Sequence, residues 1–164
     1  MESMLPGSVE SPNRDVRVFV ADEDVTLRAQ VSESLCRAGF DVTECGDGAE
    51  LFRRLCERAP AADPRKSIVV AQIRLAVLSA LQMLHSVRRL DARLPFILIT
   101  HLRGIRDVAE KAGATAVLAK PFATEELVRL VARLSTGEKR GMAPQLLGRK
   151  PDGDARHPDL GPSE

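Results

Sequence analysis

The 164-residue chain is poor in aromatic residues, since it has five Phe and neither Trp nor Tyr. Its three cysteines, Cys36, Cys45 and Cys56, show no CxxC spacing, which argues against a zinc site or a redox pair. We expect reduced thiols with packing roles in a cytoplasmic protein. The core must then be built mainly from aliphatic side chains.

Long apolar runs and an excess of one charge are also lacking. The 24 basic and 23 acidic residues leave a net charge of +1, so bulk electrostatics does not favour nucleic acid or a membrane surface. No apolar run approaches the roughly 20 residues that span a bilayer. Residues 1–13 have neither the basic nor the apolar stretch of a signal peptide, and we expect none.

Composition divides the chain into three parts. Residues 1–14 are polar and contain Pro6, Gly7 and Pro12, which predicts a flexible arm. Residues 136–164 are predicted to form a disordered tail, because Gly and Pro supply nine of the last 28 residues. Residues 15–135 are predicted to fold as a single domain, and we expect no DNA-binding output domain after it.

Two hydrophobic periods alternate within residues 15–135. Short apolar runs predict buried strands at 16–21, 40–45, 67–73, 95–100 and 116–119. Apolar residues spaced by three or four predict helices at 25–38, 49–59, 78–90, 105–112 and 124–134. We expect a left-handed C-cap at Gly39, the end of helix 105–112 at Gly113, and an N-cap at Thr124. The alternation predicts an α/β domain with a doubly wound parallel sheet.

Polar side chains stand at the ends of four predicted strands: Asp22 and Glu23, Gln72, Thr100, and Lys120. Because the carboxyl ends of parallel strands meet at one edge of a sheet, we expect these side chains to converge. The two carboxylates suit a hard cation such as Mg²⁺, and the hydroxyl and the ammonium suit phosphoryl oxygens. The set outlines a phosphoryl-transfer site that lacks a carboxylate nucleophile.

These segments resemble the receiver domains of two-component response regulators. The resemblance is carried by Val-Phe-Val-Ala-Asp22-Glu23-Asp24, by Ile-Leu-Ile-Thr100, and by the stretch from Gly113 through Lys120-Pro121-Phe122. It implies a flavodoxin-like fold of five strands and five helices. It also implies phosphorelay signalling, with phosphate taken up by an Asp at the end of the third strand.

The acceptor position departs from that pattern. Gln72 occupies it when Ile73-Arg74-Leu75 is aligned with the usual apolar tripeptide after the Asp. No Asp or Glu lies between Asp63 and Asp91, so no shift of the strand supplies a carboxylate. An amide is not an effective nucleophile toward phosphate. We therefore predict a degenerate receiver that signals by binding and not by taking up phosphate.

Other positions depart as well. The loop at 76–80 lacks the usual Pro and Gly, Val117 matches the aromatic switch residue, and His101 replaces a small residue. His101 is either a pH-sensitive gate over the pocket or a plain surface residue. Asp22 and Glu23 either retain Mg²⁺ or are neutralised by Lys120 and Arg74.

The resemblance implies a surface for a signalling partner or for a homodimer, made of about residues 105–111, 116–119 and 125–133. We predict protein–protein contact through this surface and no enzymatic activity. One competing reading is a conventional response regulator phosphorylated at another residue, such as Asp24. Another is a small phosphoryl-transfer enzyme, against which the absence of a GxGxxG or GxxxxGK[ST] loop argues.

Overall fold

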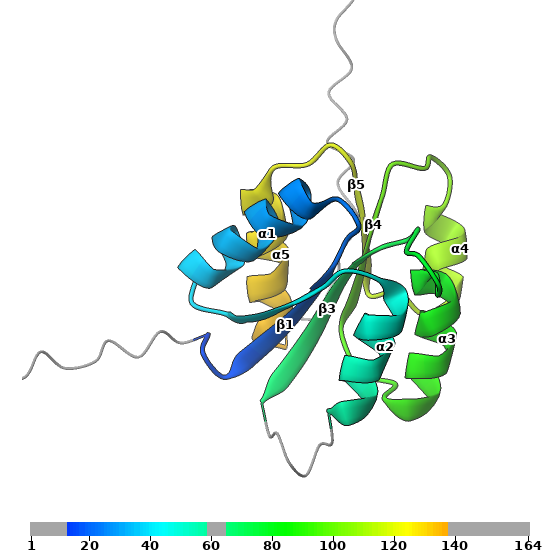
Figure 1. Ribbon diagram of the computed structural model, residues 1–164, viewed down its shortest axis with the longest axis horizontal. Coiled ribbons are helices and arrows are strands. Elements are labelled where there is room, and N and C mark those ends of the chain that lie inside the picture. The colour runs from blue at the N-terminus through cyan, green and yellow to red at the C-terminus, as the bar shows by residue number, and fades with distance from the viewer. Residues whose placement is uncertain (1–12, 59–64, 138–164) are drawn as a thin grey trace, which may run out of the picture.

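The computed structural model describes residues 13–58 and 65–137, so most of the predicted arm and tail lies outside the described residues. Five parallel strands form one sheet in the order β2–β1–β3–β4–β5 (Figure 1). The strands are β1 (Val16–Ala21), β2 (Asp41–Cys45), β3 (Lys66–Gln72), β4 (Phe96–Thr100) and β5 (Ala116–Ala119). The helices are α1 (Val25–Arg37), α2 (Gly48–Glu57), α3 (Ala80–Leu90), α4 (Arg106–Lys111) and α5 (Thr124–Ser135).

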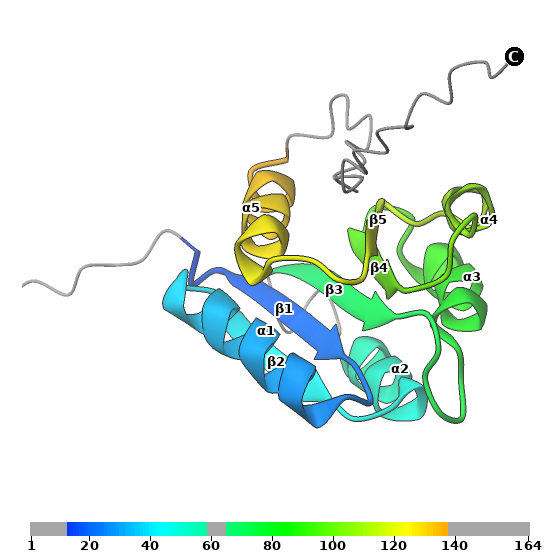
Figure 2. The ribbon, with the colours of Figure 1, turned by 90° about the horizontal axis from the view of Figure 1, so that it is seen from above.

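Helices cover both faces of the sheet (Figure 2). Helices α1 and α5 pack on one face, where Val18 and Val20 of β1 point. Helices α2, α3 and α4 pack on the other face, together with Phe19 and Ala21. A sheet covered on both faces needs strands that are apolar throughout, which explains the nearly unbroken apolar runs. The predicted fold class is confirmed: a single flavodoxin-like, doubly wound domain.

The ends of the elements follow local chemistry. Gly39 has a φ of 92°, which confirms the predicted left-handed C-cap, and Gly113, with a φ of 101°, adopts the same conformation after α4. The predicted N-cap at Thr124 is wrong. Ala123 holds the N-cap position with extended backbone and no side-chain cap, so helical geometry begins at Thr124 itself and its hydroxyl lies inside the first turn.

The cysteines differ in burial. Cys45 is fully buried, and burial raises the pKa of its thiol to about 11, in agreement with a packing role. Cys36 and Cys56 are exposed, so the packing prediction is wrong for these two. Each follows a buried leucine, Leu35 or Leu55, and a step of one residue on a helix rotates a side chain away from the buried stripe.

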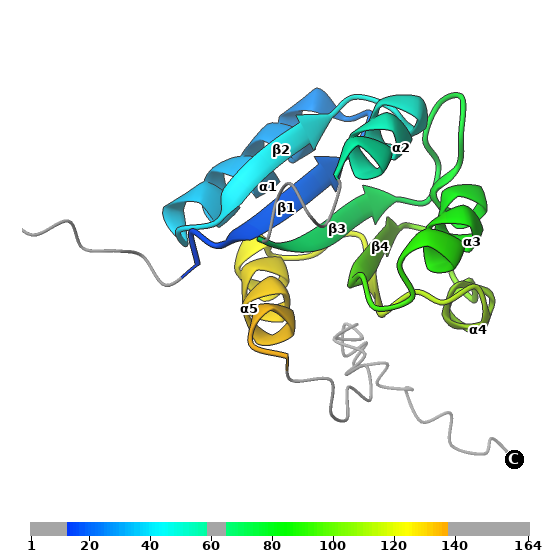
Figure 3. The ribbon, with the colours of Figure 1, turned by 90° about the horizontal axis from the view of Figure 1, so that it is seen from below.

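The loop after β3 packs directly on the start of α2 (Figure 3). The Gly48 N–H donates to the Ala76 carbonyl at 3.3 Å, and a Cβ on Gly48 would lie 1.8 Å from the Leu78 oxygen. Within this loop, Val77 has a φ of 70° and is 85% exposed. A β-branched residue is strained in this left-handed region, since its Cβ crowds the backbone.

Replacing Val77 by glycine is expected to raise the free energy of unfolding by about 1 kcal/mol. Removing the Cβ relieves about 1–2 kcal/mol of strain, and the greater freedom of glycine in the unfolded chain offsets part of that gain. Urea unfolding of both proteins measures the change. Ala76→Gly is the matched control, because Ala76 is also exposed but has no positive φ. Equal destabilisation by both variants would contradict the strain at Val77.

Within the described ranges, no helix combines the length and the apolar character needed to cross a bilayer.

Candidate functional site

The strand register brings the predicted site residues to one edge of the sheet. Ala21 pairs with Ala71, Gln72 pairs with Ile99, and Thr100 pairs with Ala119. Residues that close β1, β3, β4 and β5 therefore lie side by side, as expected for the carboxyl edge of a parallel sheet.

Asp22 is the central group of this edge. It is 2% exposed, and both of its carboxylate oxygens accept hydrogen bonds. Oδ1 accepts from the Asp24 N–H at 2.9 Å, and Oδ2 accepts from Lys120 Nζ at 3.0 Å. The Lys120 side chain is 20% exposed, so the ion pair is largely removed from water. A buried carboxylate needs such partners, since an uncompensated charge in the interior is costly.

Gln72 lies against both members of that ion pair. With its amide oxygen inward, it accepts from Lys120 Nζ at 3.3 Å, but the same oxygen then faces the Asp22 oxygens. With Nε2 inward, the amide donates to both carboxylate oxygens of Asp22, at 3.1 Å to Oδ2. We assign the second orientation, because its two hydrogen bonds to the charged Asp22 carboxylate replace contacts between acceptors and outweigh the single 3.3 Å bond from Lys120 Nζ, which this orientation gives up. An aspartate at this position would have no proton to donate there.

Thr100 and Lys120 are joined through the backbone. The Lys120 N–H donates to the Thr100 carbonyl at 2.7 Å, and the peptide bond between Lys120 and Pro121 is cis. The Thr100 side chain is buried, and its hydroxyl oxygen accepts from the Leu102 N–H at 3.0 Å. The hydroxyl thus holds the start of the β4–α4 loop. Val117, the predicted switch residue, is half-buried against the α2–α3–α4 side of the sheet.

Other predicted site residues lie outside this cluster. Arg74 and His101 are exposed, and no hydrogen bond joins either of them to Asp22 in the described part of the chain. Glu23 is exposed as well. The cation that does approach the acidic loop is Arg28, which sequence reasoning missed. It donates to the Asp22 carbonyl at 2.6 Å and to Glu44 at 3.1 Å.

Arg28 had a usable signal in the sequence. It follows the helix-capping Asp24 by four residues, so it stands one helical turn above the acidic loop. The sequence does not indicate that Arg28 pairs with Glu44, which lies near the end of the neighbouring strand β2. The pair ties the β1–α1 connection to β2.

The donor set suits Mg²⁺ poorly. Asp22, the buried carboxylate of this cluster, is already bound to an ammonium and a backbone N–H, and the third strand offers an amide instead of a carboxylate. Across residues 13–58 and 65–137, no three His, Cys, Asp or Glu side chains are grouped so that they could hold a metal ion. Mg²⁺ demands close to ideal octahedral oxygen ligation and dehydrates reluctantly, so a single occupied carboxylate is a weak site.

Asp24 serves as the N-cap of α1. One of its oxygens accepts from the Thr26 and Leu27 N–H groups, each at 3.0 Å. Two otherwise unpaired helix donors are satisfied in this way.

Replacing Asp24 by alanine is expected to lower the free energy of unfolding by about 1 kcal/mol, the usual contribution of a helix cap. Glu23→Ala is the control, because Glu23 is exposed one residue earlier and is not the cap; it should change stability by less than about 0.5 kcal/mol. Thermal and urea unfolding measure both. Equal effects from the two variants would count against the cap.

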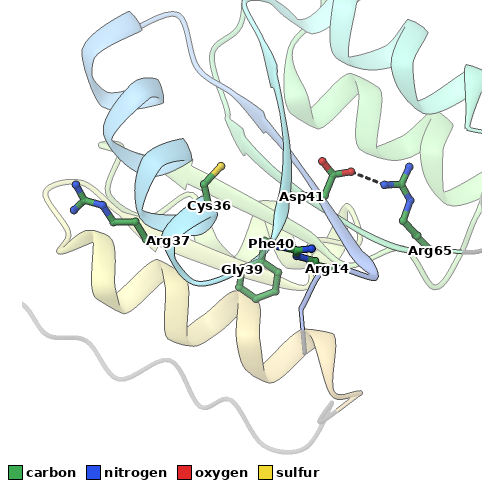
Figure 4. Close-up of a pocket in the computed structure, with 7 residues that line it drawn as sticks. All are labelled: Arg14, Cys36, Arg37, Gly39, Phe40, Asp41 and Arg65. Atoms are coloured by element: carbon green, nitrogen blue, oxygen red, sulfur yellow. Dashed lines mark hydrogen bonds and ion pairs between the residues drawn. The ribbon is translucent and has the colours of Figure 1, made fainter. Parts of the chain in front are cut away.

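A separate hollow lies at the opposite, amino edge of the sheet (Figure 4). Its volume is about 420 Å³, and Arg14, Arg37, Phe40 and Arg65 are among the residues that line it. Arg65 is bound to Asp41 at 2.7 Å, and Arg37 is paired with Glu33. Two of its three guanidinium groups thus have carboxylate partners, and the hollow is remote from the Asp22 cluster.

Comparisons with known proteins agree with this geometry. Residues 18–132 match the family model described as response regulator receiver domain. The chain is 32% identical to the probable transcriptional regulatory protein TcrX of Mycobacterium tuberculosis over 115 residues, which cover 69% of this chain and 47% of TcrX. It is also 32% identical to the transcriptional regulatory protein PrrA of the same organism over 120 residues, covering 72% of this chain and 49% of PrrA. The chain thus spans about half the length of these relatives.

Solved structures show the same fold. The chemotaxis response regulator CheY4 of Vibrio cholerae matches with a TM-score of 0.63 at 23% identity, covering 73% of this chain and 98% of CheY4. The receiver domain of the Francisella response regulator 1452 matches with a TM-score of 0.67 at 23% identity, covering 74% and 97%. The chain belongs to the receiver domain family of response regulators, which are signalling modules of two-component systems.

Proposed function

We propose that this chain is a receiver module that takes up no phosphate at position 72 and signals through protein contact. The observation that supports the proposal most directly is the position of Gln72. It ends β3, where the family carries its acceptor Asp, and its amide lies against Asp22 and Lys120. In a phosphorylated receiver domain, the corresponding acidic and lysine side chains would lie beside the phosphorylated aspartate.

Two further observations speak against a substitute acceptor. Residues 64–90 contain no Asp or Glu at all. Asp24, another carboxylate of the β1–α1 loop, is engaged as the cap of α1. A conventional response regulator phosphorylated at another residue is the competing function, and these two facts make it the weaker one.

We further propose that the charge of Asp22 is balanced from within the protein and not by Mg²⁺. Lys120 supplies the positive charge, and the Gln72 amide supplies donors at the place where a metal ion would otherwise neutralise a second carboxylate. The cluster then has a structural and not a catalytic role, and the module is not an enzyme. Three free thiols are compatible with the cytoplasmic location that we propose.

The partner surface in this proposal is the face of α4, β5 and α5. Helix α4 is short and has no side-chain N-cap, and its Val108 is 53% exposed. In receiver domains this region differs between two states, and phosphorylation shifts their balance. In this chain, the Asp22–Lys120–Gln72 cluster would hold the α4–β5–α5 region in one of the two states without phosphorylation. A signalling protein is the proposed occupant, and a second copy of the chain is the alternative.

Amide NMR spectra recorded with Mg²⁺ and beryllofluoride, an analogue of the phosphoryl group, test the proposal. We expect no saturable shift of the amides near Asp22, Gln72 and Lys120 at millimolar Mg²⁺, with or without beryllofluoride. Saturable shifts that spread from this cluster to α4 would establish a conventional, phosphate-responsive receiver instead.

A further inference from the structure

Two loops at the carboxyl edge of the sheet form a surface that the proposed function does not use. Strands β3 and β4 are neighbours, with Gln72 paired to Ile99, and the Ile73 N–H extends the ladder by donating to the Ile99 carbonyl at 2.9 Å. The loops 73–79 and 101–105 therefore start from the ends of two neighbouring strands (Figure 1).

The two loops are basic and partly apolar. Together they contain two Arg and one His but no Asp or Glu. Arg74, His101 and Arg103 are exposed, and neither arginine has an ion pair within the described residues. Val77 and Leu102 are 85% and 36% exposed beside them. We call these five residues the basic lip.

The basic lip differs from the other arginine-rich region of the molecule. At the amino edge, Arg17 and Arg65 are bound to Asp41, so those cations are already compensated. The acidic residues Glu23 and Asp24 follow β1, on the other side of β3 from β4. Among the described residues of the carboxyl edge, the loops after β3 and β4 thus carry arginines without an ion pair, whereas the acidic Glu23 and Asp24 lie on the β1 side.

We propose that the basic lip docks an acidic segment of a protein partner, with aliphatic side chains of that segment covering Val77 and Leu102. Charge complementarity favours an acidic occupant, because unpaired guanidinium groups bind carboxylates well. The two aliphatic side chains favour a protein over a nucleic acid, since the lip has no aromatic residue on which a base could stack. This inference concerns a surface that adjoins the start of α4 but is not part of the α4–β5–α5 face, and it goes beyond the proposed function.

Fluorescence anisotropy with a labelled helical peptide of Glu, Leu and Ala tests the proposal on the full chain. We expect saturable binding, with amide NMR shifts concentrated in residues 73–79 and 101–105. The double variant R74E/R103E should weaken binding at least about tenfold, because it reverses both charges. R93E is the matched control, since Arg93 is exposed but lies before β4, at the other edge of the sheet. It should change the affinity by less than about twofold.

Three outcomes would overturn the proposal. One is equal loss of binding in R74E/R103E and R93E, which would show nonspecific electrostatics. A second is equal binding of a peptide with Ser in place of Leu, which would show that aliphatic side chains do not contribute to the binding. The third is tighter binding of single-stranded DNA at the same loops. None of these outcomes bears on phosphate uptake, and a response to beryllofluoride would overturn the proposed function while leaving the basic lip intact.

Discussion

Replacing Lys120 by methionine is expected to lower the free energy of unfolding by about 3 kcal/mol. The substitution keeps most of the aliphatic volume but leaves the Asp22 carboxylate, 2% exposed, without its counter-charge. Removing one partner of a buried ion pair typically costs about 3–5 kcal/mol, and the remaining donors to Asp22 place the effect near the lower limit. Urea unfolding measures the change.

A double-variant cycle separates this charge effect from a loss of packing. Asp22→Asn combined with Lys120→Met should be more stable than Lys120→Met alone, since the double variant has no buried charge to compensate. Lys111→Met is the matched control, because Lys111 is exposed and without an ion pair in the described part of the chain; it should change stability by no more than about 0.5 kcal/mol. A Lys120→Met protein as stable as the Lys111→Met protein would contradict the proposed role of Lys120.

Replacing Gln72 by aspartate is expected to create a functional acceptor site. The new carboxylate adds a second carboxylate ligand for Mg²⁺ beside Asp22 and a nucleophile that can attack the phosphorus of acetyl phosphate, with acetate leaving. We expect Mg²⁺ affinity to rise at least about tenfold, which corresponds to about 1.4 kcal/mol. Intact mass spectrometry should then detect one added phosphoryl group in this variant.

Gln72→Asn is the matched control for that experiment. Asparagine has the size of aspartate but keeps an amide, so it should neither gain affinity for Mg²⁺ nor take up phosphate. Without Mg²⁺, the aspartate variant should be less stable than the asparagine variant, because two carboxylates then share one lysine. If the aspartate variant bound Mg²⁺ no better than the asparagine variant, the cluster around Asp22 would not be the remnant of an acceptor site.

Local pattern accounts for most of the fold. The limits of β1 and β5 match the prediction residue for residue, because each apolar run stops abruptly at a charged group, Asp22 or Lys120. The start of α3 is predicted two residues early. The loop before it is as apolar as the helix, and the true boundary is the capping box of Ser79 and Gln82.

The sequence predicts those site residues that lie at the ends of strands. The convergence of Asp22, Gln72, Thr100 and Lys120 follows from the parallel sheet, once the strands are assigned. The bond from Arg28 to Glu44 links α1 to β2, and the left-handed Val77 breaks the usual preference for glycine. Such features depend on tertiary packing around a specific loop, and no local periodicity encodes them.

The amide at position 72 gives the cluster its distinct character. In the orientation that we assign, Gln72 donates to the same carboxylate that Lys120 neutralises, so Asp22 has donors on both oxygens without any metal ion. We propose that a cluster with these hydrogen bonds favours a single arrangement of the β5–α5 connection, which begins at Lys120. This is the physical basis for expecting a receiver domain that works by contact alone.

The central claim is tested most directly by incubating the unaltered chain with acetyl phosphate and Mg²⁺ and recording its intact mass, with Gln72→Asp treated in parallel. The account predicts that the unaltered chain keeps its mass while the aspartate variant gains one phosphoryl group. A phosphoryl group on the unaltered chain, located by peptide mapping to Asp22, Glu23 or Asp24, would contradict it.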